Sequence, residues 1–180
     1  MASGSSELAV DRYYNIRMAE DKEYMVIEEA HDIIVGLKDK YPRALWPVIP
    51  EEIVVLGITN KDRPRNMKKL AWIKKIEPEM RALLGWMNSG LKYYVEVYCS
   101  DYQSWGQPRK EWILFHEMIH VPGPADHGLI KHDIEDFAVM VDAGGHDWTG
   151  REHLPSLLDG DTFPFKQHLI DRLHEEDEED

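Results

Sequence analysis

Residues 92–120, KYYVEVYCSDYQSWGQPRKEWILFHEMIH, contain the two elements on which the fold prediction depends. In residues 93–99, valine and cysteine alternate with tyrosine and glutamate, and a two-residue period predicts a β-strand. The same alternation predicts that Cys99 is buried and inert beside the valines. In residues 107–120, apolar side chains recur every three or four positions after Pro108, which predicts a helix with one apolar face.

The rest of the chain predicts further helices and strands around this unit. Apolar residues recur at helical spacing in residues 23–41, which predicts a helix of about four turns that ends before Pro42. β-branched residues predict a buried strand at 53–58, and a weaker strand at 70–76. Further helices are predicted at 78–90 (a short helix or turn), at 133–144 (between an Asp133 cap and Gly144) and around Phe165, Leu169 and Leu173. This order predicts an α+β domain whose small sheet is covered by helices on one side.

Composition and charge limit the classes of protein that this chain can belong to. A chain of 180 residues with 43% apolar residues fits one globular domain, predicted here for residues 11–173 between a flexible start (1–10) and an acidic tail (174–180). The net charge of −13 argues against a nucleic-acid or anionic-membrane binder. Because the chain has one cysteine, no signal peptide and no long apolar run, we expect a protein of the cytoplasm that neither crosses a membrane nor is secreted.

The motif HEMIH at residues 116–120 predicts a catalytic zinc site. Two histidines four residues apart lie on one face of a helix, so His116 and His120 can bind one ion. Glu117 can then take a proton from a water that zinc activates for attack on a carbonyl, and pass that proton to the departing amine.

A catalytic zinc ion usually has three protein ligands, so a third must follow the motif. The candidates are Asp126, His127, His132, Glu135 and Asp136. We favour His132, because a side chain just before the next predicted helix can point towards the first one without occupying its apolar stripe. Glu135, Asp126 and His127 stay open as alternatives, and His127 could also stabilise an oxyanion.

A resemblance to a known family covers about residues 50–148. The stretch from HEMIH (116–120) through GLIKHDIEDFAVMV (128–141) to GGHDW (144–148) resembles the putative phage metallopeptidases, whose members carry HExxH followed by an HD-x-E-[ED]-F block. The preceding residues 70–99, which include LAWIKKIEPEMRALLGW and YYVEVYC, are similar to the segment before the motif in that family.

This resemblance implies a zincin-like fold in which the sheet packs against the HExxH helix. It further implies zinc bound by His116, His120 and His132, with a catalytic Glu117. Together with the motif, it predicts a zinc-dependent metallopeptidase that acts on a peptide or protein substrate. The alternative is a zinc-binding phage protein without catalytic activity that engages a host or viral partner.

Three other features of the sequence lead to weaker expectations. The strand at 93–99 could bind an extended peptide if it lies at a sheet edge, although a central position is equally compatible with its composition. A basic run is interpreted as a solvated loop; it contains Lys61, Arg63, Arg65, Lys68, Lys69, Lys74 and Lys75. Four histidines without a spaced partner are interpreted as ordinary: His31, His146, His153 and His168.

Overall fold

A computed structural model of the chain describes residues 16–17, 22–77, 90–124, 128–132, 136–160 and 164–173. The strands in these residues are β1 (Ile16–Arg17), β2 (Glu23–Val26), β3 (Ile53–Ile58), β4 (Ala71–Lys75) and β5 (Tyr93–Tyr98). The helices are α1 (Glu29–Lys40), α3 (Cys99–Ser104), α4 (Gln107–Ile119), α5 (Ala138–Gly144) and α6 (Gln167–Arg172), with 3-10 turns η1 (Pro50–Glu52) and η2 (Trp148–Gly150). The predicted N-terminal extension, the short helix at 78–90 apart from Gly90, and the acidic tail lie outside the described residues.

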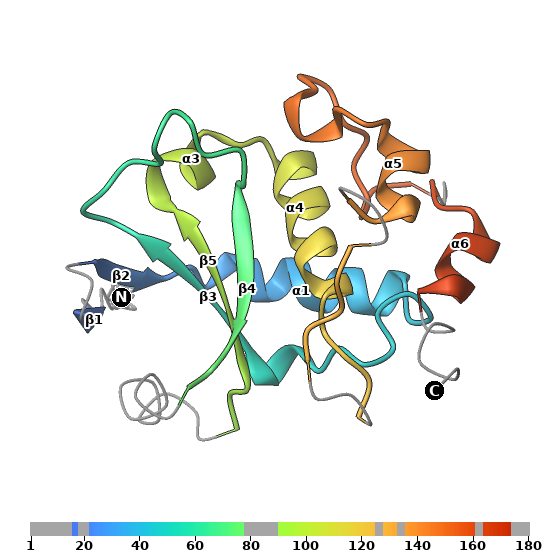
Figure 1. The fold of residues 1–180 in the computed structure, drawn as a ribbon, viewed down its shortest axis with the longest axis horizontal. Coiled ribbons are helices and arrows are strands. Elements are labelled where there is room, and N and C mark those ends of the chain that lie inside the picture. Colours follow the sequence, from blue (N-terminus) through green and yellow to red (C-terminus); the bar gives the residue numbers. More distant parts are fainter. Residues whose placement is uncertain are drawn as a thin grey trace, which may run out of the picture.

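The strands form one mixed sheet in the order β1-β2-β3-β5-β4 (Figure 1). β3 and β5 are parallel, and their register pairs Ile53 with Tyr93, whereas the other neighbours are antiparallel. The predicted strands at 53–58, 70–76 and 93–99 are confirmed as β3, β4 and β5. β5 lies between β3 and β4, so the expectation that it could be an edge strand is wrong. Within the described residues, β4 is the edge on this side of the sheet.

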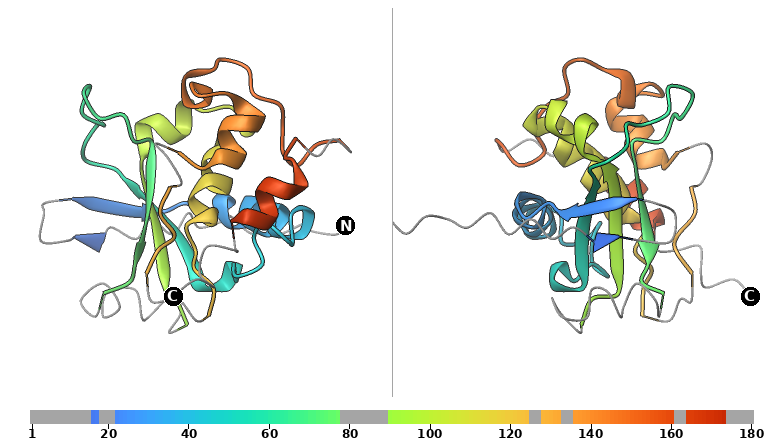
Figure 2. Two further views of the ribbon diagram at one scale, coloured as in Figure 1. Left: turned by 45° about the vertical axis from the view of Figure 1, so that its right-hand side comes forward. Right: turned by 90° about the vertical axis from the view of Figure 1, so that its left-hand side faces the viewer.

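Helices α1 and α4 pack on one face of the sheet, and α4 lies between the sheet and α5 (Figures 1 and 2). The main apolar core fills this layer, where Val95 and Val97 of β5 meet Trp112 and Phe115 of α4. A second, smaller cluster with Tyr94 and Tyr98 lies on the other face, as the predicted alternation requires. The α+β class and the zincin-like arrangement of a small sheet against the motif helix are therefore confirmed.

The helix predicted for residues 23–41 is wrong in its first part. Glu23–Val26 form strand β2, which pairs with β3, and α1 begins at Glu29. Tyr24 lies opposite Ile58 in this ladder and is 1% exposed. The helical spacing of apolar residues favours a helix here, but hydrogen bonds to a strand about 30 residues further along the chain hold these residues in an extended conformation.

The helix predicted from Asp133 begins later, at Ala138, and its cap residue is Phe137 in an extended conformation. Asp133 lies outside the described residues. The expected end at Gly144 is confirmed, and the two glycines there have separate roles. A Cβ on Gly144 would lie 2.7 Å from both Trp112 and Trp148, whereas Gly145 has a φ of +80°, which favours glycine. The doubled glycine thus lets α5 end tightly against α4.

The remaining helices agree with the sequence in position, but Cys99 does not agree in environment. The helix predicted at 107–120 is confirmed as α4, and the C-terminal helix as α6. Cys99 begins α3 and is only half-buried. No helix among the described residues has the length and apolar character that a membrane span needs.

Candidate metal centre

Helix α4 brings the motif to the outer edge of β4. Its apolar residues are buried on several sides, and Trp112, Leu114 and Phe115 have no measurable exposure. At its C-terminal end, the backbone N–H of Ile73 in β4 donates a hydrogen bond of 2.8 Å to Oε2 of Glu117. The motif, at the C-terminal end of α4, therefore contacts the outer edge of β4.

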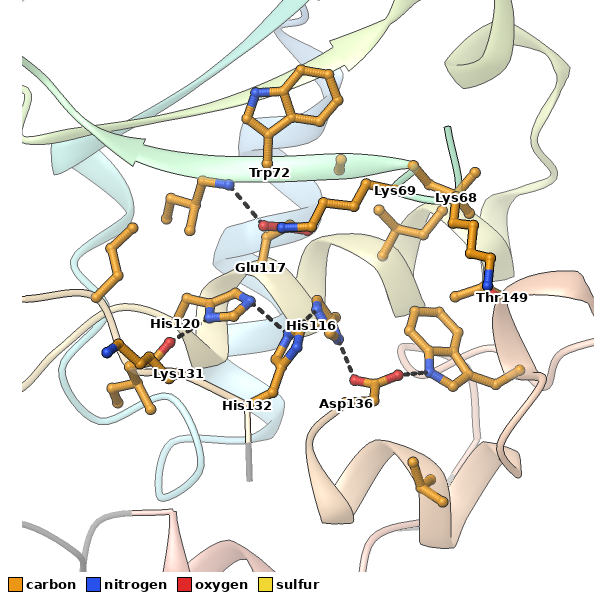
Figure 3. A pocket seen from close by; sticks show the side chains of 18 of the residues that line it. Lys68, Lys69, Trp72, His116, Glu117, His120, Lys131, His132, Asp136 and Thr149 are labelled. Carbon is orange, nitrogen blue, oxygen red and sulfur yellow. Dashed lines mark hydrogen bonds and ion pairs between the residues drawn. The ribbon is translucent and has the colours of Figure 1, made fainter. Parts of the chain in front are cut away.

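The side chains of His116, His120 and His132 converge on one point (Figure 3). Nε2 of His132 lies 3.1 Å from Nε2 of His116 and 3.2 Å from Nε2 of His120. In the described part of the chain, these three residues are the one group of His, Cys, Asp or Glu side chains that could hold a metal ion.

The spacing of these nitrogens fits a tetrahedral ion. Ligand atoms about 2.0–2.1 Å from a tetrahedral zinc lie about 3.3–3.4 Å from each other. The two measured separations are within a few tenths of an ångström of that value. Without a cation between them, three Nε2 atoms that all act as acceptors would repel each other, because their lone pairs point at the same place. The arrangement therefore fits a cation that all three nitrogens coordinate.

One backbone hydrogen bond and one contact from a side chain to the backbone join the end of α4 to the segment that carries His132. Ile130 N donates to His120 O at 2.9 Å, and Ile130 O lies 2.5 Å from Nδ1 of His120. The second contact fixes the ring of His120 with Nδ1 protonated, which leaves Nε2 free to bind a metal. His132 is two residues further on, so the same contact brings it to the first two histidines.

Asp136 orients His116 from behind the site. Its Oδ1 lies 3.0 Å from Nδ1 of His116 and accepts the N–H of Phe137 at 2.7 Å, while Oδ2 accepts Nε1–H of Trp148 at 2.6 Å. Burial alone would raise the pKa of Asp136, but these donors, His116 first, hold that pKa below its usual value. A carboxylate behind a metal-binding histidine is a common arrangement, and it makes the ring a better ligand.

Phe137 forms an apolar support beneath the three imidazoles. Its ring centroid lies 5.3, 4.7 and 4.9 Å from those of His116, His120 and His132, respectively, and its side chain is fully buried. Burial lowers the pKa of His120 to about 4, so this ring is neutral at pH 7, as a metal ligand must be.

Glu117 is 5% exposed and lies beside the three histidines without belonging to their group. Burial raises its pKa, while the neighbouring His116 and the hydrogen bond from Ile73 act in the opposite direction. A carboxylate with a raised pKa exchanges protons nearer neutral pH, which is the property of a general base.

A pocket of about 800 Å³ opens over these residues. β4 and the residues before it form one wall, from Lys68 to Ile73, and the segment around Trp148 and Thr149 lies on the other side. A cavity of this size is typical of a site for a small molecule or for a few residues of a peptide.

Comparison with known proteins assigns the family. The family model described as "Putative phage metallopeptidase" matches residues 22–158. The chain belongs to this family. No curated protein and no solved structure matches the chain. The family implies a metal, and among the described residues the three histidines form the group that could hold one.

The structure sorts the other residues that the sequence singled out. Asp126, His127 and Glu135, the alternative ligands, lie outside the described residues. Asp136, also a candidate ligand, instead contacts His116 at Nδ1.

Three further residues lie at the pocket, which the sequence did not predict. Lys68 and Lys69 are exposed in the loop before β4, as predicted for a solvated loop, and they also line the pocket. His146, interpreted from the sequence as ordinary, lines it too. The sequence contains only part of the information that places His146 at the pocket. The two glycines before His146 indicate a turn, but the position of this turn against α4 depends on the packing of Trp148 on Trp112, which no local pattern predicts.

Proposed function

We propose that the chain is a zinc-dependent metallopeptidase in which His116, His120 and His132 bind the zinc ion and Glu117 is the general base. The observation that carries this proposal is the convergence of three imidazole Nε2 atoms beside a buried carboxylate. Membership of the metallopeptidase family supports the reaction class.

The set of ligands favours zinc in a catalytic rather than a structural site. Neutral imidazole nitrogens suit zinc, and three protein ligands leave a fourth position for water or substrate. A structural zinc would usually have four protein ligands, most often including cysteine. The single cysteine, Cys99, is not part of the histidine group.

The residues of this chain have complementary tasks in peptide hydrolysis. When bound, zinc lowers the pKa of a water molecule to about 7 and polarises the carbonyl under attack. Glu117 accepts a proton from that water, and its Oε1 is suited to this because Oε2 already accepts the Ile73 N–H. Glu117 then donates the proton to the departing amine, while Asp136 and Ile130 O keep the rings of His116 and His120 in place.

The outer edge of β4 is the place where an extended substrate can bind. β4 pairs with β5 on its inner side, and its residues Ala71, Trp72 and Ile73 line the pocket beside Glu117. A peptide that adds a strand to this edge would pass the metal with its backbone hydrogen-bonded, which is a common mode of peptide recognition.

Metal analysis and peptide cleavage together test this proposal. We expect about one zinc per chain in gently purified protein and little zinc in the His116→Ala variant. The matched control is His153→Ala, which changes an exposed histidine outside the pocket and should keep the full zinc content. Cleavage of a mixed peptide substrate should stop with a zinc chelator and return when zinc is added. Equal zinc in His116→Ala and wild type would refute the ligand assignment, and chelator-resistant cleavage would refute the mechanism.

A further inference from the structure

The lysines of this chain fall into two groups by their contacts. Every lysine lies within the described residues, and most are held by other groups of the protein. Lys22 and Lys74, for example, both contact Glu96, and Lys166 contacts Asp142 at 2.6 Å. In the described part of the chain, three lysines have neither a hydrogen bond nor an ion pair: Lys68, Lys69 and Lys131.

All three of these lysines line the pocket over the histidines. Lys68 and Lys69 belong to the segment before β4, whereas Lys131 lies between Ile130 and His132, so two distant parts of the sequence bring positive charge to the same cavity. Figure 3 shows Lys69 extending towards Glu117, and its charge acts on both Glu117 and His120.

The carboxylates of the described pocket lining are already bonded within the protein. They are Glu117, which accepts the Ile73 N–H, and Asp136, which contacts His116 and Trp148. Lys68 and Lys131 therefore have no carboxylate partner among the described residues of the lining, and Lys69 acts on Glu117 through its charge without forming an ion pair. This is unusual in a chain with a net charge of −13, where carboxylates are abundant partners for a lysine.

We propose that the pocket selects substrates that carry a carboxylate close to the scissile bond, and that the positive charges of Lys68, Lys69 and Lys131 attract this carboxylate. The proposal rests on the peptidase function proposed above, and it names acidic peptides as the substrate class. A concave site lined with one sign of charge concentrates ligands of the opposite sign, while the acidic remainder of the surface repels them. The carboxylate can come from an acidic side chain or from the C-terminus of a peptide.

Binding of defined peptides to a non-cleaving variant tests the proposal separately from turnover. The protein is zinc-loaded Glu117→Gln, and the probes are fluorescein-labelled octapeptides with either two glutamates or two glutamines at the centre. Each peptide is made with a free and with an amidated C-terminus, which separates side-chain from terminal carboxylates. Fluorescence anisotropy gives the Kd at about 20 mM and at about 500 mM NaCl, because salt screens exposed charges.

We expect the glutamate peptides, the free-acid peptides or both to bind about tenfold more tightly than their neutral counterparts at low salt, with a smaller ratio at high salt. In the same Glu117→Gln background, Lys68→Gln/Lys69→Gln should reduce the ratio to about 3 or less, and Lys131→Gln should reduce it further. The matched control is Lys92→Gln/Lys166→Gln, which removes the same charge from exposed lysines outside the pocket and should keep the ratio. Because the ratio compares the Kd values of an acidic and a neutral peptide for the same variant, any effect of the Lys69 substitution that changes both Kd values equally cancels.

The outcomes separate this inference from the proposed function. Equal binding of acidic and neutral peptides, no measurable binding of any probe, or an equal loss in the control variant would overturn the inference. Lysine-dependent binding of the acidic probes supports it, even if the wild-type protein then fails to cleave them and the peptidase function falls. Cleavage of neutral and acidic peptides at equal kcat/KM by the wild type would uphold the function and refute the acidic preference.

Discussion

Two buried glutamates on the same helix have opposite environments. Glu111, in the N-terminal half of α4, is 1% exposed, and its Oε2 accepts hydrogen bonds from Ser156 Oγ at 2.7 Å, Leu157 N at 2.6 Å and Leu158 N at 3.2 Å. Glu117, in the C-terminal half, is 5% exposed and accepts one hydrogen bond within the described residues, from Ile73. Three donors hold Oε2 of Glu111, whereas Glu117 has one donor among the described residues and lies beside the histidines.

This difference shows that burial alone does not mark a functional carboxylate. Glu96 on β5 is fully buried too, and it resembles Glu111 because Lys22, Lys74 and Tyr24 all donate to it. A buried carboxylate with several donors stabilises the fold, since removing it leaves those donors unpaired. A buried carboxylate with few donors lowers the stability of the fold, and such groups occur most often at functional sites. We therefore expect a structural role for the N-terminal half of α4 and a chemical role for its C-terminal half.

The largest expected effect comes from Glu117→Gln. The amide keeps the size of the side chain and can still accept the Ile73 N–H, but it cannot accept a proton from water. We expect kcat to fall by a factor on the order of 10²–10⁴, with unchanged zinc content and a melting temperature no lower than that of the wild type. Peptide cleavage, elemental analysis and thermal denaturation measure these three quantities. If Glu111→Gln lowers kcat per folded molecule as strongly, the distinction between the two glutamates fails.

Asp136→Asn should weaken metal binding by about 10–100-fold. The change removes the negative charge opposite Nδ1 of His116, so the ring is less well oriented and a poorer ligand. Competition with a zinc-binding dye gives the affinity, and Asp142→Asn, an exposed aspartate that pairs with Lys166, is the control. Equal zinc affinity in the two variants would show that Asp136 has no part in the site.

Glu111→Gln should affect stability instead. The three donors all bond to Oε2, and an uncharged amide oxygen is a weaker acceptor than a carboxylate oxygen. We therefore expect the free energy of unfolding to fall by about 1–3 kcal/mol, measured by urea denaturation. Zinc affinity of the folded protein should not change. Glu152→Gln, on an exposed side chain, gives the baseline for losing one negative charge. A stability loss no greater than that of Glu152→Gln would contradict the structural role.

The sequence predicts this protein best where structure depends on neighbouring residues. β5 and α4 follow from periodicity, and the spacing of HEMIH gives the geometry of His116 and His120. The helical spacing at residues 23–26 is misleading because hydrogen bonds to β3, far along the chain, decide the conformation there. Local patterns carry no information about such pairings.

The surroundings of the site were less accessible from the sequence for the same reason. Asp136 contacts His116 because Trp148 and Phe137 hold its carboxylate, and no spacing rule links these residues. The lysine cluster joins Lys68 and Lys69 to Lys131 across about 60 residues of sequence. The basic run was visible in the sequence, but its position over a cavity depends on the sheet edge at β4.

The smallest expected effect concerns Tyr41, which connects α1 to the structural half of α4. Its hydroxyl donates to Leu157 O at 2.7 Å, and burial, reinforced by the charge of Glu111, raises its pKa to about 12. Because this pKa is above the unfolded value of about 10, the neutral hydroxyl stabilises the fold fully below pH 10. That contribution is lost as the pH rises from about 10 through about 12.

We therefore expect the wild type to lose on the order of 1 kcal/mol more stability than Tyr41→Phe between about pH 9 and pH 11, as measured by urea denaturation. Parallel curves for the two proteins would contradict the raised pKa. In Glu111→Gln, the second cause of the raised pKa is absent, so the loss attributable to Tyr41 should still begin near pH 10 but should be smaller and end at a lower pH. Glu117→Gln should leave this alkaline loss unchanged, because Glu117 is not among the charges that act on Tyr41. A shift in that variant would mean that the two halves of α4 are coupled and that their roles are not separate.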